Sequence, residues 1–361
     1  MKRIVLCADG TWNEPEKRNE KTGRIYPTNV LKVARAVRPQ SAAGVVQTVY
    51  YHEGVGTAGG LDKFTGGAFG HGIEQNVRSL YRYLVFNYEP GDDLFLFGFS
   101  RGAFTVRTLI GYLNCIGLLE KDDEYYNPEL YGLYESSEPR DSEAWKKAFR
   151  NIDNPRPCPP IRFIGVWDTV GALGAPGLLG QVFNRKKYQY HDVGLNQHVQ
   201  HAFHALAIDE RRRPFAPTLW HRLSGWAGVL EQAWFPGVHS NVGGGNSPDG
   251  LANEALHWMI EKAEGLGLEF DSRFLKFYRP CFNSTLNDSM SLMYKAMGPH
   301  KRPVAKQLAD GECLHQAAVD RRNLAACSYD PENLKACFAV PSATRVVNTT
   351  RVERGTPCPA I

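Results

Sequence analysis

One short segment restricts the possible folds of this chain more than any other. Leu94 to Phe99 is a continuous apolar run with no alternation of polar and apolar residues, as expected for a strand that is buried on both faces. A helical pattern carrying Phe104, Leu109 and Leu113 begins directly after Ser100. Strands that lead straight into helices are typical of parallel sheets with right-handed crossovers. The segment therefore predicts an α/β fold.

The same alternation of strand and helix recurs along the chain. Arg3 to Ala8 and Gln47 to His52 predict strands, Thr28-Asn29 predicts the start of a helix, and Ile73 to Leu84 carries apolar residues at helical spacing. Later segments predict strands at 161–167 and 230–236 and helices at 197–208 and 254–264. We therefore expect a mostly parallel sheet with helices on both faces.

Two regions depart from this pattern. Residues of about 120–160 are rich in charge, tyrosine and proline, and they predict an insertion that covers the edge of the sheet or its active face. Periodicity weakens beyond residue 271, and the tail from 331 has no clear pattern. The expected organisation is one catalytic domain over residues 1–325, followed by an irregular C-terminal extension over residues 326–361.

Composition excludes several classes of protein. Of the 361 residues, 43% are hydrophobic and 22% are charged, which is ordinary for a globular protein, and a net charge of +4 is too small to indicate a nucleic-acid partner. No apolar run reaches the ~18 residues of a membrane span, and Ile4 to Ala8 is too short for a signal peptide, which predicts a soluble, cytoplasmic product. The eight cysteines include no CxxC pair, so we expect most to be buried thiols.

The strongest local motif lies between the run ending at Phe99 and the helix that follows it. Gly98-Phe99-Ser100-Arg101-Gly102 fits the pattern G-x-S-x-G. A sharp turn from strand to helix forces such a serine into a strained conformation that exposes its hydroxyl, and the two glycines leave room for the turn. The alternative is a glycine-rich turn that contains a serine by chance. The strand–turn–helix context favours a nucleophile.

A nucleophilic serine needs a base and an acid that orients the base. Asp168 and His239 each follow a predicted strand, and they come after Ser100 in the order Ser, Asp, His that hydrolases of this architecture use. The carboxyl ends of parallel strands share one edge of the sheet, so the three side chains are expected to converge. Asp168 could instead cap a turn. Asp209 is the second choice for the acid and His315 for the base.

The oxyanion hole requires backbone amides aimed at the reacting carbonyl. Arg101 supplies one by its position after the nucleophile, and Gly10 and Thr11 in the loop after the first strand supply the other. Asp9 in that loop is expected to hold it by hydrogen bonds to backbone amides, with cation binding or orientation of a donor as alternatives. His201 and His204 are three residues apart, but no carboxylate or cysteine at a companion spacing completes a metal site.

Two further patches have ordinary explanations. Gly54 to Gly72 is rich in glycine but lacks the endings of phosphate-binding and dinucleotide-binding loops, so it predicts a flexible surface loop. Asp209 to Pro214 carries adjacent opposite charges, which indicates a structural network of ion pairs. The alternative is that one of its arginines faces an anionic group of the substrate, such as a phosphate.

Several phrases together resemble one known family. They are Asp9-Gly10-Thr11-Trp12-Asn13, Thr28-Asn29-Val30, Gly54-Val55-Gly56-Thr57, Leu96 to Phe104, Asp168-Thr169-Val170 and Gly237 to Gly245. The family is a group of α/β-hydrolases, formerly a domain of unknown function, that is linked to type VI secretion phospholipase effectors. The resemblance spans roughly residues 1 to 325. It implies an α/β-hydrolase-like fold, a Ser100–Asp168–His239 triad, no cofactor, and a glycerophospholipid or other acyl-ester substrate, with peripheral membrane contact and export without a signal peptide as expectations.

This chain departs from the family pattern in two respects. Many members have aspartate at the position of Asn241, and effector members often carry a membrane-docking module, for which no segment here is long or apolar enough. An esterase that acts on a smaller acyl substrate is therefore an alternative within the family. Two further alternatives are a non-catalytic binding or scaffold protein with the hydrolase fold, and a metal-dependent hydrolase that uses Asp9 and Asp168.

Overall fold

The computed structural model describes residues 1–10, 23, 25–54, 66–136, 138–170, 195–339, 344–352 and 358. Within these residues the protein is built around one eight-stranded sheet in the order β2-β1-β3-β4-β5-β6-β7-β8. All neighbouring strands are parallel. The strands are β1 (Arg3–Ala8), β2 (Gln47–His52), β3 (Asp93–Phe99), β4 (Ile161–Trp167), β5 (His201–Ala207), β6 (Val229–Phe235), β7 (Glu312–His315) and β8 (Val346–Val347).

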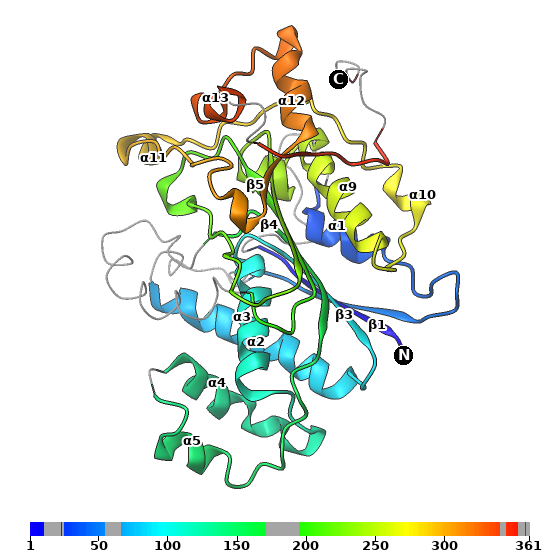
Figure 1. Cartoon of the computed structure of the whole chain (residues 1–361), viewed down its shortest axis with the longest axis vertical. Helices are drawn as coiled ribbons and strands as arrows, with labels where there is room; N and C mark the ends of the chain where they lie inside the picture. The colour runs from blue at the N-terminus through cyan, green and yellow to red at the C-terminus, as the bar shows by residue number, and fades with distance from the viewer. Residues whose placement is uncertain are drawn as a thin grey trace.

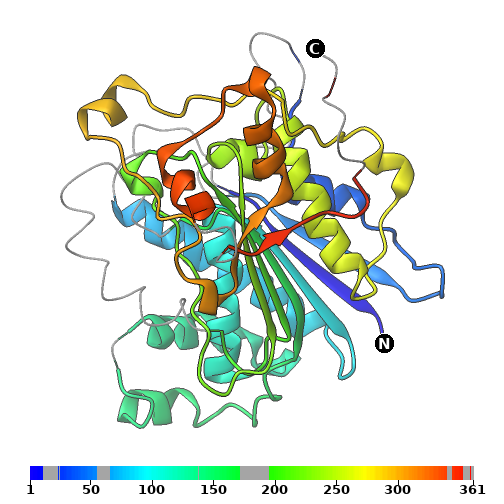
Figure 2. The same ribbon diagram turned by 45° about the horizontal axis from the view of Figure 1, so that its top comes forward.

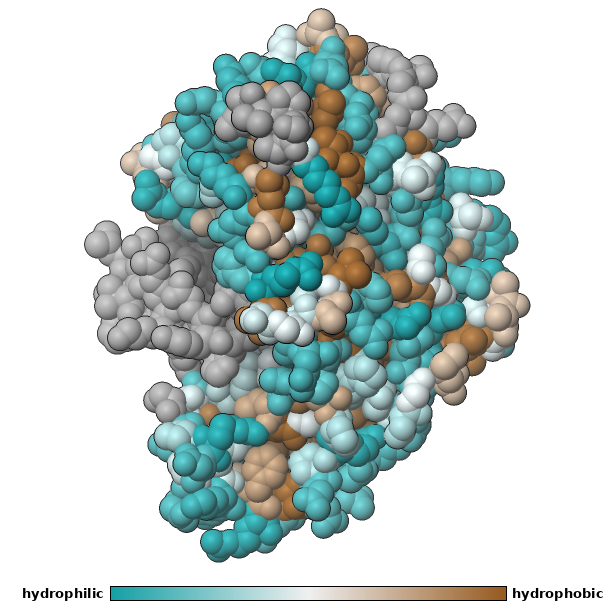
Figure 3. Space-filling model, in the orientation of Figure 1, coloured by the Kyte–Doolittle hydropathy of each residue, from teal (hydrophilic) through white to brown (hydrophobic). Residues whose placement is uncertain are grey.

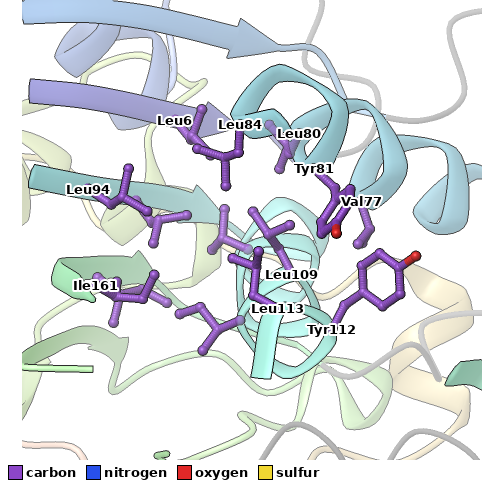
Figure 4. Packing of buried hydrophobic residues seen from close by; sticks show 14 of the residues in the cluster. Leu6, Val77, Leu80, Tyr81, Leu84, Leu94, Leu109, Tyr112, Leu113 and Ile161 are labelled. Carbon is purple, nitrogen blue, oxygen red and sulfur yellow. The ribbon is translucent and has the colours of Figure 1, made fainter. Parts of the chain in front are cut away.

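Helices cover both faces of this sheet, which confirms the predicted α/β-hydrolase-like fold class (Figure 1). On one face α2 (Gly66–Asn87) and α3 (Arg101–Ile116) pack against the strands, and on the other lie α1 (Asn29–Ala36) and α9 (Gly250–Glu264). Figure 4 shows the first of these interfaces, where side chains of the central strands meet the apolar stripes of the two helices. The labelled residues include Leu6, Leu94 and Ile161 from strands, and Leu80, Leu84, Leu109 and Leu113 from helices.

The order of the strands determines where a ligand can bind. From β1 the chain goes to β2 on one side of β1 and then returns to place β3 on the other side. Ligands of open parallel sheets bind beyond the carboxyl ends of the strands, at the point where this reversal occurs. Ser100 follows β3 at that point. Figure 2 shows the fold turned so that its top comes forward, with the orange-to-red C-terminal part over the upper part of the molecule.

The insertion at residues of about 120–160 does not cover the edge of the sheet or its active face, which is where the sequence predicted it. Its helices are η1 (Lys121–Tyr126), α4 (Asn127–Glu135) and α5 (Glu143–Ala148). They pack on α2 and α3, where Tyr131, Tyr134 and Trp145 join the hydrophobic core, and the Tyr112 hydroxyl of α3 donates to Asn127. The insertion follows the carboxyl end of α3, so it covers the outer surface of these helices and not the active edge (Figure 1).

The C-terminal part is more regular than expected. It contains α10 (Ser272–Leu275), α11 (Leu292–Ala296), α12 (Gln316–Asn323) and α13 (Glu332–Ala339), with short 3₁₀ turns at Leu308–Asp310 and Ala325–Cys327. Residues 326–361 are therefore not wholly irregular, because α13 joins a buried cluster with Trp234 and Leu314, and β8 extends the sheet. The boundary at residue 325 stays a proposal.

Two other expectations need correction. Residues 201–207 form strand β5 and not a helix, because this seven-residue segment pairs with β4 and β6 and is buried along nearly its whole length. Cys281 and Cys358 form a disulfide. The expectation of buried thiols holds for Cys7, Cys313 and Cys337, whereas the described Cys115, Cys158 and Cys327 are half-buried.

The surface seen in Figure 3 is mainly hydrophilic, with apolar residues in small separate groups. Among the described residues, none of the helices has the length and apolar character needed to cross a membrane.

Candidate active site

Ser100 occupies a strained turn between β3 and α3. Its φ of 56° and ψ of −118° lie in a region that residues with a side chain rarely adopt. Such strain persists only where the surrounding structure enforces it, and it is concentrated at functional sites. The turn is held by hydrogen bonds from the Ser100 amide to the Trp167 carbonyl, at 3.0 Å, and from the Phe104 amide to the Ser100 carbonyl, at 3.3 Å. The strand–turn–helix context predicted for the G-x-S-x-G motif is therefore present.

The two glycines of the motif permit close packing around this turn. A Cβ at Gly98 would lie 2.6 Å from the Ala103 Cα, so glycine lets the start of α3 rest on the end of β3. A Cβ at Gly102 would overlap the backbone of Ala8 and Asp9. Glycine at 102 thus brings the loop after β1 against the first turn of α3, beside Ser100.

The contact at Gly102 leads to a prediction about stability. Gly102→Ala is expected to destabilise the fold by about 1–3 kcal/mol, because the added methyl group has no space and the backbone of β1 must move. Gly132→Ala is the matched control, since Gly132 lies exposed in α4 with nothing within 4 Å of its Cβ position, and this variant should gain about 0.5–1 kcal/mol. Urea unfolding compares the two. Equal stability of both variants would contradict the packing argument.

Asp168 lies at the end of the neighbouring strand and is also strained. It has a φ of 38° and is fully buried. Its amide donates to the Ala205 carbonyl of β5, and its Oδ1 accepts from the Ala207 amide at 3.0 Å. Because the Ser100 amide bonds to the residue before Asp168, the ends of β3 and β4 hold the two residues side by side.

His239 begins the short helix α8 (His239–Gly243), which follows β6. Its Nδ1 lies 2.6 Å from Asp168 Oδ2. Its ring packs 4.7 Å from the ring of Phe99, the residue before Ser100, and 5.1 Å from that of Phe215. The histidine is thus hydrogen-bonded to the acid and stacked beside the serine turn. Because a carboxylate accepts, Nδ1 carries the proton and Nε2 is left as the basic nitrogen.

A buried arginine that the sequence did not point to holds the same carboxylate. Arg302 donates from Nη1 to Asp168 Oδ1 at 2.6 Å and from Nη2 to Asp168 Oδ2 at 3.0 Å. It also donates to the carbonyls of Ala207 and Phe215. Burial alone would raise the pKa of Asp168, but the charges and hydrogen bonds of Arg302 and His239 hold this pKa well below its ordinary value. Asp168 is therefore a carboxylate at neutral pH.

A second layer of polar groups supports the loop after Asp168. The Thr169 amide donates to His204 Nε2 at 3.1 Å, and His204 Nδ1 faces Gln232 Oε1 at 3.4 Å. Burial lowers the pKa of His204 to about 3, so it stays neutral and can accept the Thr169 amide. His201 lies three residues away on the same strand, which places its side chain on the opposite face, so the two histidines do not form a metal pair.

Glu210 holds the backbone of His239 by a hydrogen bond. Its carboxylate accepts from the His239 amide at 3.2 Å, from two nitrogens of Arg212 and from the Ser289 hydroxyl. Burial would raise the pKa of Glu210, but the bonds from Arg212 outweigh it and lower this pKa. The predicted ion-pair network is therefore present. Arg211 pairs with Asp288, whereas Arg213 is exposed and has no side-chain hydrogen bond or ion pair recorded among the described residues.

Asp9 accepts from a backbone amide, as expected, and also from two side-chain hydroxyls. Its Oδ2 accepts from the Thr28 hydroxyl at 2.5 Å and the Tyr51 hydroxyl at 2.8 Å, and its Oδ1 accepts from the Gly10 amide at 2.7 Å. Asp9 thus ties the loop after β1 to the cap of α1 and to β2. The Gly10 amide, predicted as an oxyanion donor, has this carboxylate as its acceptor. Thr11, the other predicted donor of this loop, lies outside the described residues.

Asp209 and His315, the second choices for the acid and the base, have other hydrogen-bond partners. Asp209 accepts from the Gly237 amide and the Tyr329 hydroxyl, and burial raises its pKa to about 6. Its recorded bonds include none to His239. His315 caps α12, stacks on Phe235 and bonds to Thr349. Both are parts of the structural framework. Of the glycine-rich segment, residues 55–65 lie outside the described part, and residues 66–72 begin α2.

The described residues around the site lack a set of metal ligands. Among the described residues no group of three or more histidine, cysteine, aspartate or glutamate side chains could hold a metal ion. Both oxygens of Asp168 already accept from charged or backbone donors, and those of Asp9 accept from hydroxyls and an amide. The two carboxylates are therefore committed to other partners.

Comparison with known proteins identifies relatives of the chain. A family model described as the catalytic domain of type VI secretion system, Tle1-like phospholipase effectors matches residues 2–262. The uncharacterized protein YEL023C of Saccharomyces cerevisiae is 28% identical over 239 residues, which is 59% of this chain and 32% of that protein.

Two solved structures are also similar. The crystal structure of an uncharacterized protein from Pseudomonas aeruginosa aligns with a TM-score of 0.42 at 17% identity, over 82% of this chain and 48% of that one. The structure of the Tle1 effector bound to the VgrG spike of the type 6 secretion system aligns with a TM-score of 0.36 at 22% identity, over 69% of this chain and 53% of that one. The chain spans about a third of the curated relative and about half of each solved chain.

Proposed function

We propose that this chain, which belongs to the family of type VI secretion, Tle1-like phospholipase effector catalytic domains, is a serine hydrolase that cleaves carboxylic esters of lipids. One observation carries the proposal. The His239–Asp168 pair, joined by a 2.6 Å hydrogen bond, is packed through Phe99 against the strained turn that holds Ser100. A nucleophile, a base and a group that orients the base are the parts that acyl transfer requires.

The proposed reaction has two halves. Ser100 Oγ attacks the ester carbonyl while His239 Nε2 accepts the serine proton, and the resulting imidazolium returns that proton to the leaving alkoxide. Water then attacks the acyl-enzyme with His239 again as base, which releases the fatty acid and regenerates Ser100. Asp168 keeps His239 in the tautomer with a proton on Nδ1 and stabilises the imidazolium.

The oxyanion of the tetrahedral intermediate is assigned to the start of α3. The Arg101 amide is the first of the helix, where the helix dipole favours negative charge. The Gly10 amide contributes only if it exchanges its bond to Asp9 for one to the oxyanion. The side chain of Arg101 is half-buried, and burial lowers its pKa to about 9, which leaves it cationic at neutral pH.

We propose a glycerophospholipid as the substrate, met at a membrane surface. The family description supports this class, and α11 exposes Leu292 and Met293 close to the site. Tyr294 of the same helix packs on Phe215, which contacts His239. An anionic head group also has a cationic neighbour in the exposed Arg213, in the 3₁₀ turn Arg213–Phe215 that contains Phe215. Hydrolysis of phospholipid vesicles, compared with a soluble short-chain ester, distinguishes a phospholipase from a small-substrate esterase.

Labelling with a fluorophosphonate tests the nucleophile. We expect peptide mass spectrometry to find the phosphonyl group on Ser100 in the wild type and to find almost none in His239→Ala, because the serine is a weak nucleophile without its base. His315→Ala is the control, since His315 has other partners, and it should label like the wild type. An unlabelled Ser100 in folded wild-type protein would contradict the proposal and favour a binding or scaffold protein.

A further inference from the structure

The arginine on the catalytic acid comes from a part of the chain outside the region that matches the family model. That match ends at residue 262, and Arg302 lies 134 residues after Asp168. Arg302 is 1% exposed, and its guanidinium makes two roughly parallel bonds to the two carboxylate oxygens. Such a paired contact fixes the plane of a carboxylate as well as its position. A lysine would offer only a point charge.

Further contacts fix Arg302 itself. Its Nη1 and Nη2 also donate to the carbonyls of Ala207, at the end of β5, and Phe215, which packs on His239. The Arg302 carbonyl accepts from Asn333 of α13, whose side chain also donates to the Ile208 carbonyl. The neighbouring Val304 and Ala305 lie in a buried cluster with Trp234. Arg302 is thus connected to β5 through its guanidinium and to α13 through its backbone carbonyl.

We propose that Arg302 is a positioning residue that holds Asp168 in the orientation at which Oδ2 accepts the Nδ1 proton of His239. The inference rests on the proposed triad. Asp168 Oδ2 receives both His239 Nδ1 and Arg302 Nη2, whereas Oδ1 receives Arg302 Nη1 and the Ala207 amide. Without the guanidinium, one bond remains on each oxygen, from the Ala207 amide and from His239, and the orientation of the carboxylate is less firmly fixed. Residues well beyond 262 therefore belong to the active site.

Charge supports the same role. The groups that face Asp168 are His239 from α8, Arg302, and the neutral His204 from β5, which is itself influenced by Arg107 of α3. Arg302 is the cation among them that accounts for much of the lowered pKa of Asp168. Its removal is expected to raise this pKa.

Kinetics of Arg302→Ala test the inference. We expect kcat to fall by about 10²-fold with KM little changed, because misplacement of a catalytic group by about 1 Å costs roughly that much. Millimolar guanidinium should restore part of the activity. Arg302→Lys, the variant to use if the alanine variant does not fold, should lose activity and not respond to guanidinium.

Arg321→Ala provides the matched control. Arg321 is another buried arginine of the C-terminal part, but it donates to the carbonyls of Phe282 and Ser284 and lies over Tyr329. Its removal should cost stability, and guanidinium should not raise its activity. The inference would be overturned if guanidinium restored the activity of Arg302→Ala and Arg321→Ala equally. A folded Arg302→Ala with the kcat of the wild type would also overturn it.

A spectroscopic measurement separates this inference from the proposed function. The proton between His239 Nδ1 and Asp168 gives a far-downfield NMR signal that needs no substrate. We expect Arg302→Ala to shift or lose this signal and Arg321→Ala to keep it. If the wild type neither labels nor hydrolyses esters, the proposed function fails, yet a signal lost only in Arg302→Ala still supports the positioning role. A signal unchanged in Arg302→Ala refutes that role even in an active enzyme.

Discussion

Ser100→Ala is expected to hydrolyse esters about 10⁴-fold or more slowly than the wild type, with substrate binding nearly intact. The hydroxyl is the proposed nucleophile, and alanine leaves no group that can form the acyl-enzyme. Alanine has the same Cβ as serine, so the strained backbone at φ 56° is no worse and the stability should stay within about 0.5 kcal/mol. Initial rates on phospholipid vesicles, with urea unfolding alongside, measure both quantities.

The same variant separates the catalytic hypothesis from its principal alternative. A scaffold or binding protein would keep its full biological activity without the hydroxyl, because no bond is made to Ser100. A metal-dependent hydrolase would also keep its activity in Ser100→Ala and would lose it to a chelator. Either result would remove Ser100 from its proposed role.

Asp168→Asn is expected to have the second large effect, on rate and on stability together. The rate should fall by about 10⁴-fold, because the amide no longer fixes the tautomer of His239. The fold should lose about 3–5 kcal/mol, since Arg302 is left as a buried cation without its carboxylate. Asp209→Asn is the control for the rate, because Asp209 has the Gly237 amide and Tyr329 as partners.

The difference in the free energy of unfolding between the wild type and Asp168→Asn is expected to depend on pH. The pKa of Asp168 is lower in the folded protein than the ordinary value of 3.8. A carboxyl group with a lowered pKa stabilises the fold above its unfolded pKa, and this contribution disappears as the pH falls. The gap between the wild type and Asp168→Asn should therefore be constant near neutral pH and narrow below about pH 4. Urea unfolding at several pH values measures it, and a gap that widens in acid would contradict the ion pair with Arg302.

The strands that flank the site could be predicted because turn residues bound their short apolar runs. The runs that end at Phe99 and Trp167 are short, apolar and followed by turns, so they form β3 and β4 where expected. The segment His201–Ala207 was misread because it too is buried on both faces, and a short apolar run does not distinguish a strand from a helix. Pairing with β4 and β6 decides its structure, and pairing is not visible in a local pattern.

The hydrogen-bond partners of the site residues were harder to predict from the sequence than the places of these residues after strands. Asp168 and His239 could be proposed from their places after strands, and the structure joins them by a hydrogen bond. Arg302 gave no signal, because it lies in a segment without periodicity and reaches Asp168 only through the folding of the C-terminal part. The same holds for Tyr51 and Thr28, which bind Asp9 from separate elements. Contacts between distant residues depend on the completed fold.

The position of Arg302 along the chain has a consequence for biosynthesis. A ribosome makes Ser100, Asp168 and His239 well before it makes Arg302 and Asn333, which anchors the Arg302 loop. A nascent chain that already contains all three residues of the proposed triad therefore still lacks the guanidinium that bonds to Asp168. In the proposed lipid hydrolase, this order of synthesis places completion of the active site after residue 333 has been added.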